Sequence, residues 1–264
     1  MESLNKNNIN LTVFIDLKKA FDTVDISILL DKLFYYGIRG KELLWFKNYL
    51  SRTQQVFTGE ALSEIISMIC GIPQGTVLGP ILFILFINDL PGVLELFCQL
   101  FADDCTLQAE GSTIEELVKK MTSELAKAEQ WFIANKLTLN LKKTKFAVFG
   151  NDLNALKKIP DLSISGTKID RIGINQDEKM VRFLGLWVSD NGQYFYHIEK
   201  LKAKLNSALY SLSSSKENTP KRIRLTIYRA LFESQIRFAS IIFGSASETK
   251  LEELLILQKK LSGS

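Results

Sequence analysis

The chain has few of the residues from which many metal and redox sites are built. It contains one histidine and three cysteines among 264 residues. The cysteines, Cys70, Cys98 and Cys105, are odd in number and scattered, so they lack the spacing of a zinc site and favour a reducing compartment. We expect His197, the single histidine, to be an exposed residue at the start of a helix with no general-base role.

The chain also lacks a long hydrophobic run. Its longest apolar stretch, ILFILFI at residues 81–87, is far below the ~20 residues that span a bilayer, so we expect a buried helix and no membrane segment. The N-terminal residues MESLNKNNIN are polar and do not resemble a signal peptide. The cysteine pattern and this N-terminus together favour an intracellular location, nuclear or cytoplasmic. A length of 264 residues, 46% of them hydrophobic, predicts a globular protein of one large or two small domains.

The net charge of +4 is small, but the charges are unevenly distributed. From Tyr196 onward basic residues outnumber acidic ones by about two to one, whereas the earlier part of the chain is slightly acidic. A basic C-terminal region fits contact with a phosphate backbone, and solvated helix faces explain the same pattern. Charge alone therefore does not identify a nucleic-acid-binding region.

Hydrophobic periodicity predicts a mixed order of strands and helices. Residues 11–16, LTVFID, are a short apolar run that ends on an acid and predict a buried strand. Ser112 and Glu115 match a capping box before an amphipathic helix, and Gly37 is expected to end an earlier one. The other expected elements are helices at 26–36, 41–51 and 80–90, a Gly- and Pro-rich loop at 71–80, strands at 53–59, 64–72, 145–150 and 181–192, and an acidic hairpin at 94–111. After Gly192 we expect helices at 197–212, 221–243 and 251–261, with a break at 213–220.

In outline this order is strand, helix, hairpin, helix, strand, which is the split β-α-β-β-α-β pattern of a ferredoxin-like sheet. The predicted fold class is therefore α+β, with a helical region after the sheet. In that topology the first strand and the central hairpin are neighbours. Asp16, at the end of the first strand, can then face Asp103 and Asp104 at the hairpin tip.

Asp103 and Asp104 stand side by side in the stretch LFADDCTL, residues 100–107, with apolar residues close on both sides. A tight turn explains an aspartate here, because its side chain can bond the nearby backbone, but a turn does not require two carboxylates. Three converging carboxylates would repel one another, and some would have to bind protons unless a cation neutralised them. Hard oxygen ligands of this kind suit Mg²⁺ or Mn²⁺.

Five stretches of the chain resemble the palm motifs of reverse transcriptases from non-LTR, LINE-like retrotransposons, and they occur in the family's order. These are FIDLKKAFDTVD, GIPQGTVLGPILFILFINDL, LFADDCTL, NKLTLNLKKTKFAVFG and FLGLWVS. The resemblance runs from residue 11 to residue 190 and continues more weakly into the helical C-terminal part. Five motifs in order are a specific signal, whereas a single pair of adjacent aspartates is common.

The resemblance implies an RNA-directed DNA polymerase that uses an RNA template, a DNA primer and deoxynucleoside triphosphates. It also implies two Mg²⁺ ions, or Mn²⁺ in their place, for a two-metal nucleotidyl transfer. By the same resemblance Asp16, Asp103 and Asp104 are the catalytic residues and metal ligands, with Asp16 and Asp103 at the core of the set. The backbone carbonyl of Leu17 is a further ligand implied by the first motif.

Three more residues match positions of the family that contact the nucleotide or the template. Phe21 matches the bulky side chain under the incoming sugar that rejects a 2′-hydroxyl, and a core aromatic at a helix start is the alternative. Gln74 and Gly75 match residues that line the pocket for the new base pair, where a glycine lets the backbone approach the nucleic acid. An ordinary loop glycine is the alternative there. Asp22 and Asp25 fit structural acids at a helix start.

The fourth and fifth motifs supply the remaining site residues. Lys143 matches a lysine that acts near the pyrophosphate as an acid or charge stabiliser, and a surface lysine between Lys142 and Lys145 is the alternative. Leu184 and Gly185 match the hairpin that grips the primer backbone, and an ordinary core strand is the alternative.

The resemblance implies a palm at residues 1–192, with the fingers largely absent, and a helical thumb-like region at residues 193–264. Lys6 is the only basic residue before Asp16, so the basic residues that fingers bring to the triphosphate are not expected. Positioning contributes most of the catalysis in phosphoryl transfer, so we hypothesise an incomplete copy with low or no activity alone. A partner chain that supplies the fingers is an open alternative.

Two other functions compete with the polymerase. One is a non-catalytic nucleic-acid-binding remnant of a retroelement, which the intact Asp16, Asp103 and Asp104 count against, because RNA binding alone does not need them. The other is an intron-encoded maturase, which the sequence of the AFDTVD motif and the lack of a maturase-like basic tail disfavour.

Overall fold

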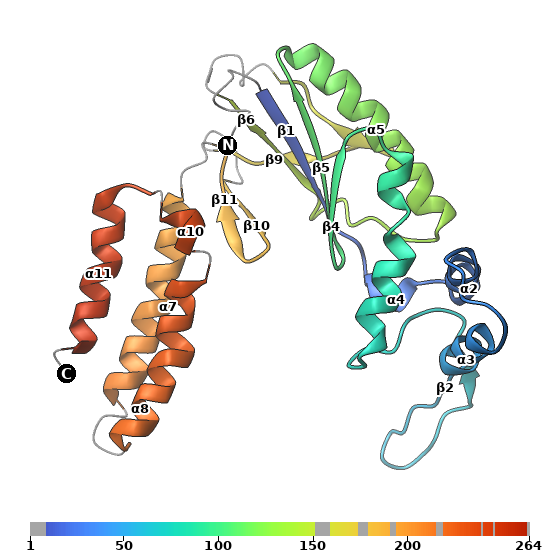
Figure 1. The fold of residues 1–264 in the computed structure, drawn as a ribbon, viewed down its shortest axis with the longest axis horizontal. Helices are drawn as coiled ribbons and strands as arrows, with labels where there is room; N and C mark the ends of the chain where they lie inside the picture. The colour runs from blue at the N-terminus through green and yellow to red at the C-terminus, as the bar shows by residue number, and fades with distance from the viewer. Residues whose placement is uncertain are drawn as a thin grey trace. The chain divides into compact units, whose positions relative to one another are not determined.

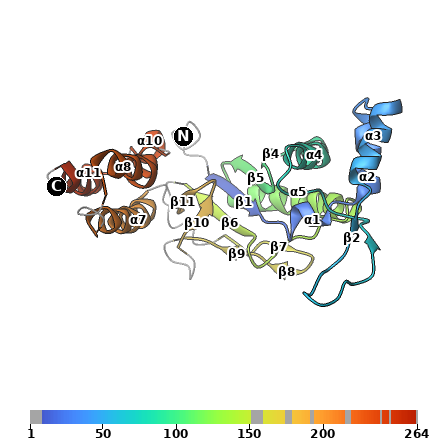
Figure 2. The same cartoon turned by 90° about the horizontal axis from the view of Figure 1, so that it is seen from below.

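The computed structural model describes residues 9–150, 159–173, 179–190, 194–214, 219–238, 240–244 and 246–262. The chain divides into two compact units, Met1–Arg171 and Ile172–Ser264, here called the first and second units. Each unit has its own hydrophobic core, and the two cores share no residue. The elements of both units are labelled in Figures 1 and 2.

A five-stranded sheet forms the centre of the first unit. Its strands lie in the order β4-β5-β1-β6-β9, and all neighbours are antiparallel except β6 and β9. The predicted contact between the first strand and the acidic hairpin is confirmed, because β1 pairs with β5 along its whole length. The strands span Ile9–Ile15 (β1), Phe97–Phe101 (β4), Asp104–Gly111 (β5), Lys145–Phe149 (β6) and Asp170–Arg171 (β9).

Helix α5 (Ile114–Ala134) lies against one face of this sheet, as Figure 1 shows. Its buried side chains recur at the three- and four-residue spacing of one helix face, as the sequence predicted. The predicted capping box does not form, because Thr113, one residue after Ser112, is the N-cap and its side chain makes no capping hydrogen bond. The helix is therefore stabilised by the packing of its apolar face without a side-chain cap at its start.

Helical segments and two short β-ribbons complete the first unit. The three helices predicted before the hairpin are present, and Gly37 follows the first of them with φ +94°, which confirms its role as a helix stop. The strands predicted at 53–59 and 64–72 pair over only two residues each, and the short strands β7 to β9 were not predicted. The bounds are α1 Ala20–Thr23, α2 Ile26–Tyr35, α3 Gly40–Leu50, β2 Thr53–Gln54, β3 Ile66–Ser67, α4 Leu78–Ile87, η2 Leu90–Val93, β7 Ser163–Ile164 and β8 Thr167–Lys168.

A buried cation joins three of these elements. The Lys32 ammonium on α2 donates to the carbonyl of Phe86 on α4 and to the Asp89 carboxylate, both at 2.6 Å. It also lies 4.5 Å from the ring centroid of Trp131 on α5, whose indole N–H donates to Asp89 at 3.3 Å. Burial lowers the pKa of Lys32, and the carboxylate of Asp89 opposes that shift.

The second unit is a β-hairpin followed by helices. Helix α7 contacts α8, α9, α11 and the hairpin strand β11, so it is the central element of this unit. Its buried residues Ile198, Leu201 and Leu205 pack with Phe232 and Phe243 from the later helices. The bounds are β10 Val181–Phe183, β11 Leu186–Val188, α7 Phe195–Ser214, α8 Lys221–Tyr228, the π-helical turn η3 Arg229–Glu233, α9 Ser234–Arg237, α10 Ser240–Phe243 and α11 Glu248–Ser262.

Three sequence predictions about the second unit are wrong. The strand expected at 181–192 is divided by a turn at Leu184 and Gly185 into the paired strands β10 and β11. The single helix expected at 221–243 is interrupted, because a π-helical turn carries Phe232 into the core and Phe238 then leaves the helix with extended ψ 121°. His197 is not exposed but 6% accessible. It lies four residues before Leu201 and eight before Leu205, so it belongs to the buried stripe of α7.

Some expectations fall on residues that the structure does not describe, namely Lys6, Gly192 and residues 215–218 of the predicted break. Among the helices that are described, none combines the length and the apolar character needed to cross a bilayer.

Candidate active site

The three aspartates singled out in the sequence lie at one end of the central strands. Asp16 directly follows β1, and Ile15 before it pairs with Cys105, the residue after Asp104. The pair Phe101 and Asp104 closes the β4–β5 hairpin, which leaves Ala102 and Asp103 as its two turn residues. The antiparallel register therefore brings Asp16 beside the acidic turn, as the topology predicted.

Both acidic segments contain backbone strain. Ala102, in the turn, has φ +52°, and Lys19, three residues after Asp16, has φ +48°. Residues other than glycine pay roughly 1–2 kcal/mol for this left-handed conformation, and such strain is concentrated at functional sites. This strain independently supports the interpretation that this edge of the sheet carries a functional site.

The carboxylates interact electrostatically. Partial burial raises the pKa of Asp104, and the negative charges of Asp103 and Asp16 raise it further. Within the described part of the chain, however, no three histidine, cysteine, aspartate or glutamate side chains are grouped closely enough to hold a metal ion as they stand. The three aspartates are thus close enough to interact electrostatically, but they are not close enough to bind one metal ion together.

The segment of the fourth motif holds Asp16 in place. The side-chain amide of Asn140 donates to the Asp16 carboxylate at 2.8 Å, and the backbone N–H of Asn140 donates to the Asp16 carbonyl at 2.8 Å. The N–H of Asp16 donates in turn to the hydroxyl of Thr144 at 3.2 Å, and Thr144 is fully buried. A β-bridge joins Leu17 to Leu139 between these bonds. Asn140 and Thr144 were not predicted, although both lie in the quoted motif.

The loop of the second motif runs along α1, where it meets the first motif. The N–H of Ile72 donates to the Phe21 carbonyl at 2.8 Å, and the Gln74 amide donates to the Asp22 carboxylate at 2.6 Å. Gly75 has φ +74°, so a glycine suits its backbone. The exposed Gln74 and Gly75 and the half-buried Phe21 therefore lie on adjoining segments.

Phe21 and Asp25 also have structural contacts. The ring of Phe21 stacks on Phe83 with 4.7 Å between centroids. One face of the Phe21 ring therefore packs against the core, as the alternative of a core aromatic predicts. Asp25 is the N-cap of α2 and accepts from the Ile28 N–H at 3.0 Å and from the Lys136 ammonium at 2.6 Å. Its predicted structural role is confirmed.

Lys143 has an exposed side chain, and its N–H donates to the Asn140 carbonyl at 3.0 Å. Its neighbour Lys145 is not a surface lysine, because it is 7% accessible and pairs with Asp170 at 2.7 Å.

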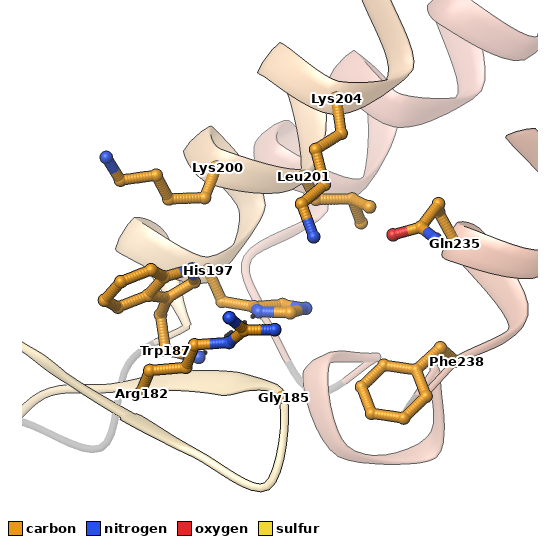
Figure 3. A pocket seen from close by; sticks show the side chains of 9 residues that line it. All are labelled: Arg182, Gly185, Trp187, His197, Lys200, Leu201, Lys204, Gln235 and Phe238. Carbon is orange, nitrogen blue, oxygen red and sulfur yellow. Dashed lines mark hydrogen bonds between the residues drawn. The ribbon is translucent and has the colours of Figure 1, made fainter. Parts of the chain in front are cut away.

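In the second unit, Leu184 and Gly185 form the two-residue turn between β10 and β11, with φ +46° and +86°. Positive φ at both positions is the mark of a type I′ hairpin turn. Figure 3 shows this turn near Phe238, at the rim of a small cavity that Arg182 and His197 also line.

A family model described as "Reverse transcriptase (RNA-dependent DNA polymerase)" matches residues 2–188, and the chain belongs to this family. The similar curated proteins come from mobile elements, which agrees with the predicted LINE-like origin. A 115 kDa protein of the type-1 retrotransposable element R1DM of Drosophila melanogaster is 25% identical over 90% of this chain and 23% of its own length. The RNA-directed DNA polymerase from the mobile element jockey of Drosophila funebris is 22% identical over 99% of this chain and 29% of its own length. The chain therefore spans less than a third of these relatives.

Among solved structures, the apo telomerase from Candida tropicalis, truncated from its C-terminal domain, aligns with a TM-score of 0.47. The sequence identity is 14%, and the alignment covers 71% of this chain and 36% of that one. Telomerase from Candida albicans in complex with a fragment of telomeric RNA aligns with a TM-score of 0.34 and 15% identity, over 89% of this chain and 40% of that one.

Proposed function

We propose that the chain is the catalytic part of an RNA-directed DNA polymerase that extends a DNA primer on an RNA template. The observation that carries the proposal is the convergence of Asp16, Asp103 and Asp104 at one edge of the sheet, in a member of the reverse transcriptase family. The raised pKa of Asp104 supports the proposal. In a cation-binding site without its cation, the carboxylates repel one another, and this repulsion raises their pKa values.

The donor set fits a hard divalent cation, since it consists of carboxylate oxygens. Asp16 and Asp103 would hold the metal, with Asp104 and the Leu17 carbonyl as further ligands, and the carboxylates would have to draw closer to do so. When bound, two Mg²⁺ or Mn²⁺ ions would acidify the primer 3′-hydroxyl and neutralise the triphosphate. Asn140 and Thr144 would keep Asp16 oriented toward the acidic turn.

We propose the remaining roles by family position. Phe21 would lie under the incoming sugar, Gln74 and Gly75 would line the pocket for the new base pair, and Lys143 would meet the pyrophosphate. Leu184 and Gly185 would contact the primer backbone.

The element order β1, α4, β4, β5, α5, β6 follows the split β-α-β-β-α-β pattern, which supports the assignment of a ferredoxin-like palm to residues 1–192. The helices of residues 193–264 would form the thumb-like region. The compact second unit already begins at Ile172, so the β10–β11 hairpin belongs with these helices in the folded chain.

Primer extension by the purified chain tests the proposal. The assay uses an RNA template with a DNA primer, in Mg²⁺ and separately in Mn²⁺. We expect Asp103→Asn to lower extension by at least about a hundredfold, because it removes charge from the metal site. Asp31→Asn is the matched control, since it makes the same chemical change at an exposed position on α2.

Three results bear on the conclusion. Extension that Asp103→Asn abolishes and Asp31→Asn preserves supports the polymerase. Extension that survives Asp103→Asn contradicts the assigned site. A well-folded chain that binds an RNA–DNA hybrid but never extends the primer contradicts catalysis by this chain alone and favours the binding-only alternative.

A further inference from the structure

The loop at residues 71–79, which carries Gln74 and Gly75, is held from two sides. On one side it bonds the segment of the first motif, through the N–H of Ile72 and the amide of Gln74. On the other side it bonds Tyr49, in the last turn of α3, and Arg52, which follows that helix. None of the five motifs includes Tyr49 or Arg52, so the resemblance assigns these two residues no role.

The hydroxyl of Thr76 is the centre of the second attachment. It donates to the Pro73 carbonyl at 2.9 Å and accepts the Gly79 N–H at 3.1 Å, so it closes the loop on itself. The Tyr49 hydroxyl donates to the same oxygen at 3.0 Å. One donated and two accepted bonds use the full capacity of a hydroxyl group. Of the three partners that fix Thr76, Tyr49 is the one that comes from another element.

Gly79 allows the loop to close so tightly. A Cβ at this position would lie 2.7 Å from the Pro73 carbonyl oxygen, which is a backbone atom and cannot swing aside. The Gly79 N–H belongs to the first turn of α4, where N–H groups have no partner within the helix, and Thr76 supplies the missing acceptor. The loop and the start of α4 are therefore one compact unit, and Tyr49 attaches that unit to α3.

Arg52 holds the other end of the loop. Its guanidinium Nη2 donates to the Gly71 carbonyl at 2.8 Å. Gly71 has φ +91°, and its N–H donates to the Val24 carbonyl at 2.8 Å on the side of the first motif. Because both ends of the loop are attached, the exposed Gln74 and Gly75 between them are held at a defined place.

The Tyr49 side chain has little freedom of its own. Its ring stacks on that of Trp45, one helical turn earlier, with 5.4 Å between centroids and 8° between planes. The half-buried ring also packs against the core of the first unit. A ring held on a helix in this way presents its hydroxyl to Thr76 in one orientation, which suits an anchor for a loop.

We propose that Tyr49, acting through the Thr76 hydroxyl, is a positioning residue that sets where Gln74 and Gly75 meet the new base pair, while Arg52 anchors the start of the same loop. The inference rests on the proposed function, because only a polymerase has a base pair to place there. Asp16 is held by the fourth motif, so loss of the anchor should weaken nucleotide binding more than the chemical step.

Primer extension at varied nucleotide concentration separates these two effects. We expect Tyr49→Phe to raise the KM for the deoxynucleoside triphosphate about fivefold or more and to change kcat by less than about twofold. The change removes the bond to Thr76 but keeps the ring that stacks on Trp45. Tyr35→Phe is the matched control, since it removes the same hydroxyl from α2, where Tyr35 is 85% exposed, and should alter neither constant.

Variants of Thr76 test whether Tyr49 acts through it. Thr76→Val removes the hydroxyl at nearly constant shape, so we expect it to raise KM at least as much as Tyr49→Phe does. Thr76→Ser restores the hydroxyl and should recover most of the lost affinity. Adding Tyr49→Phe to Thr76→Val should raise KM little further, because residues that share one interaction have non-additive effects.

Hydrogen exchange of the full chain gives a readout that needs no catalysis. We expect Tyr49→Phe to speed amide exchange in peptides that cover residues 71–79 by about fivefold or more, because the loop opens more often once the anchor is lost. Tyr35→Phe should leave exchange in these peptides unchanged.

Three results would overturn the proposal. If the parent chain and Tyr49→Phe extend primers with the same KM, Tyr49 does not position the loop, although the polymerase function stands. If the effects of Tyr49→Phe and Thr76→Val on KM multiply fully, Tyr49 does not act through Thr76. If the parent chain never extends a primer, the proposed function fails, and hydrogen exchange decides about the anchor. Unchanged exchange in Tyr49→Phe then overturns the anchor, and faster exchange supports it.

Discussion

At the scale of single residues, the candidate site depends on a side chain that carries no charge. Asn140 bonds Asp16 through both its amide and its backbone N–H, from 124 residues further along the chain. Such a neighbour fixes the rotamer of a carboxylate without competing for its cation. We therefore assign Asn140 as a positioning residue for Asp16.

Asn140→Ala should lower primer extension by about tenfold and raise the Mg²⁺ concentration needed for half-maximal rate, because Asp16 loses its orienting bond. Extension rates measured across a Mg²⁺ series give both numbers. Asn48→Ala, at an exposed position on α3, serves as the control. A variant that lost rate with an unchanged Mg²⁺ midpoint would argue for a structural role of Asn140 alone.

The N-cap of α2 gives a prediction about pH. Burial raises the pKa of Asp25, but the bonds from Lys136 and from the Ile28 N–H outweigh it and hold the pKa below the ordinary value of 3.8. Because the folded-state pKa is lowered, the ionised carboxylate stabilises the fold above the unfolded value, and this contribution is lost as the pH falls through the folded pKa. Asp25→Ala should therefore cost about 1 kcal/mol at pH 7 and progressively less below pH 3.8.

Urea unfolding at pH 7, 5 and 3.5 would measure this change. Asp25→Asn keeps a capping oxygen, so its cost at pH 7 should be the smaller of the two. An equal cost of Asp25→Ala at every pH would show that the charge contributes nothing.

At the scale of elements, the Lys32 site joins α2 to α4 and α5 through one buried ammonium. The side chain of Lys32 is only 13% accessible, so its charge depends on the Asp89 carboxylate. Removal of one partner of a buried pair leaves an uncompensated charge, whereas removal of both need not.

Only Lys32 is buried, and the Asp89 side chain is 46% accessible, so water screens part of the interaction. Asp89→Ala should therefore cost about 1–2 kcal/mol in the free energy of unfolding, and the double change Lys32→Met with Asp89→Ala should recover most of that loss. Urea unfolding of the three variants forms the test. The exposed pair Lys168 and Asp161, with both side chains 63% accessible, is the contrast, and Asp161→Ala should change stability by less than about 1 kcal/mol. A double variant as unstable as Asp89→Ala would refute the explanation by unpaired charge.

Sequence analysis predicted the elements that are long enough to show a regular hydrophobic pattern. The strand at β1 and the amphipathic α5 carry clear patterns, and their topology placed Asp16 beside Asp103 and Asp104. The two-residue strands β7, β8 and β9 are too short to show a period. Local motifs were less reliable, since Thr113 is the N-cap in place of the predicted Ser112.

Two features of the sites needed the three-dimensional structure. The bonds from Asn140 and Thr144 to Asp16 cross more than 120 residues of sequence, and no local pattern encodes such a contact. His197 was read as a polar residue at a helix start. The structure shows that His197 lies on the same buried helix face as Leu201 and Leu205. The four-residue spacing of these three residues was the sequence signal for its burial.

At the scale of the whole molecule, the two units have separate cores. Phe83 is fully buried in the first core and Phe232 in the second. Separate cores predict that calorimetry of the chain resolves two unfolding transitions and not one.

Phe83→Ala should shift one of these transitions and Phe232→Ala the other, each by the roughly 3–5 kcal/mol that a large buried aromatic contributes. Differential scanning calorimetry of the parent chain and both variants would assign the transitions. A single transition that both substitutions lower equally would show that the units unfold as one.

The position of β4 at the end of the sheet order has a consequence for handling the protein. Among the strands that the structure describes, β4 pairs with β5 alone, and Phe97 and Phe101 on it are 64% and 62% exposed. An open edge with exposed aromatics is a template on which another extended chain can add a strand, which makes concentrated solutions prone to self-association and precipitation.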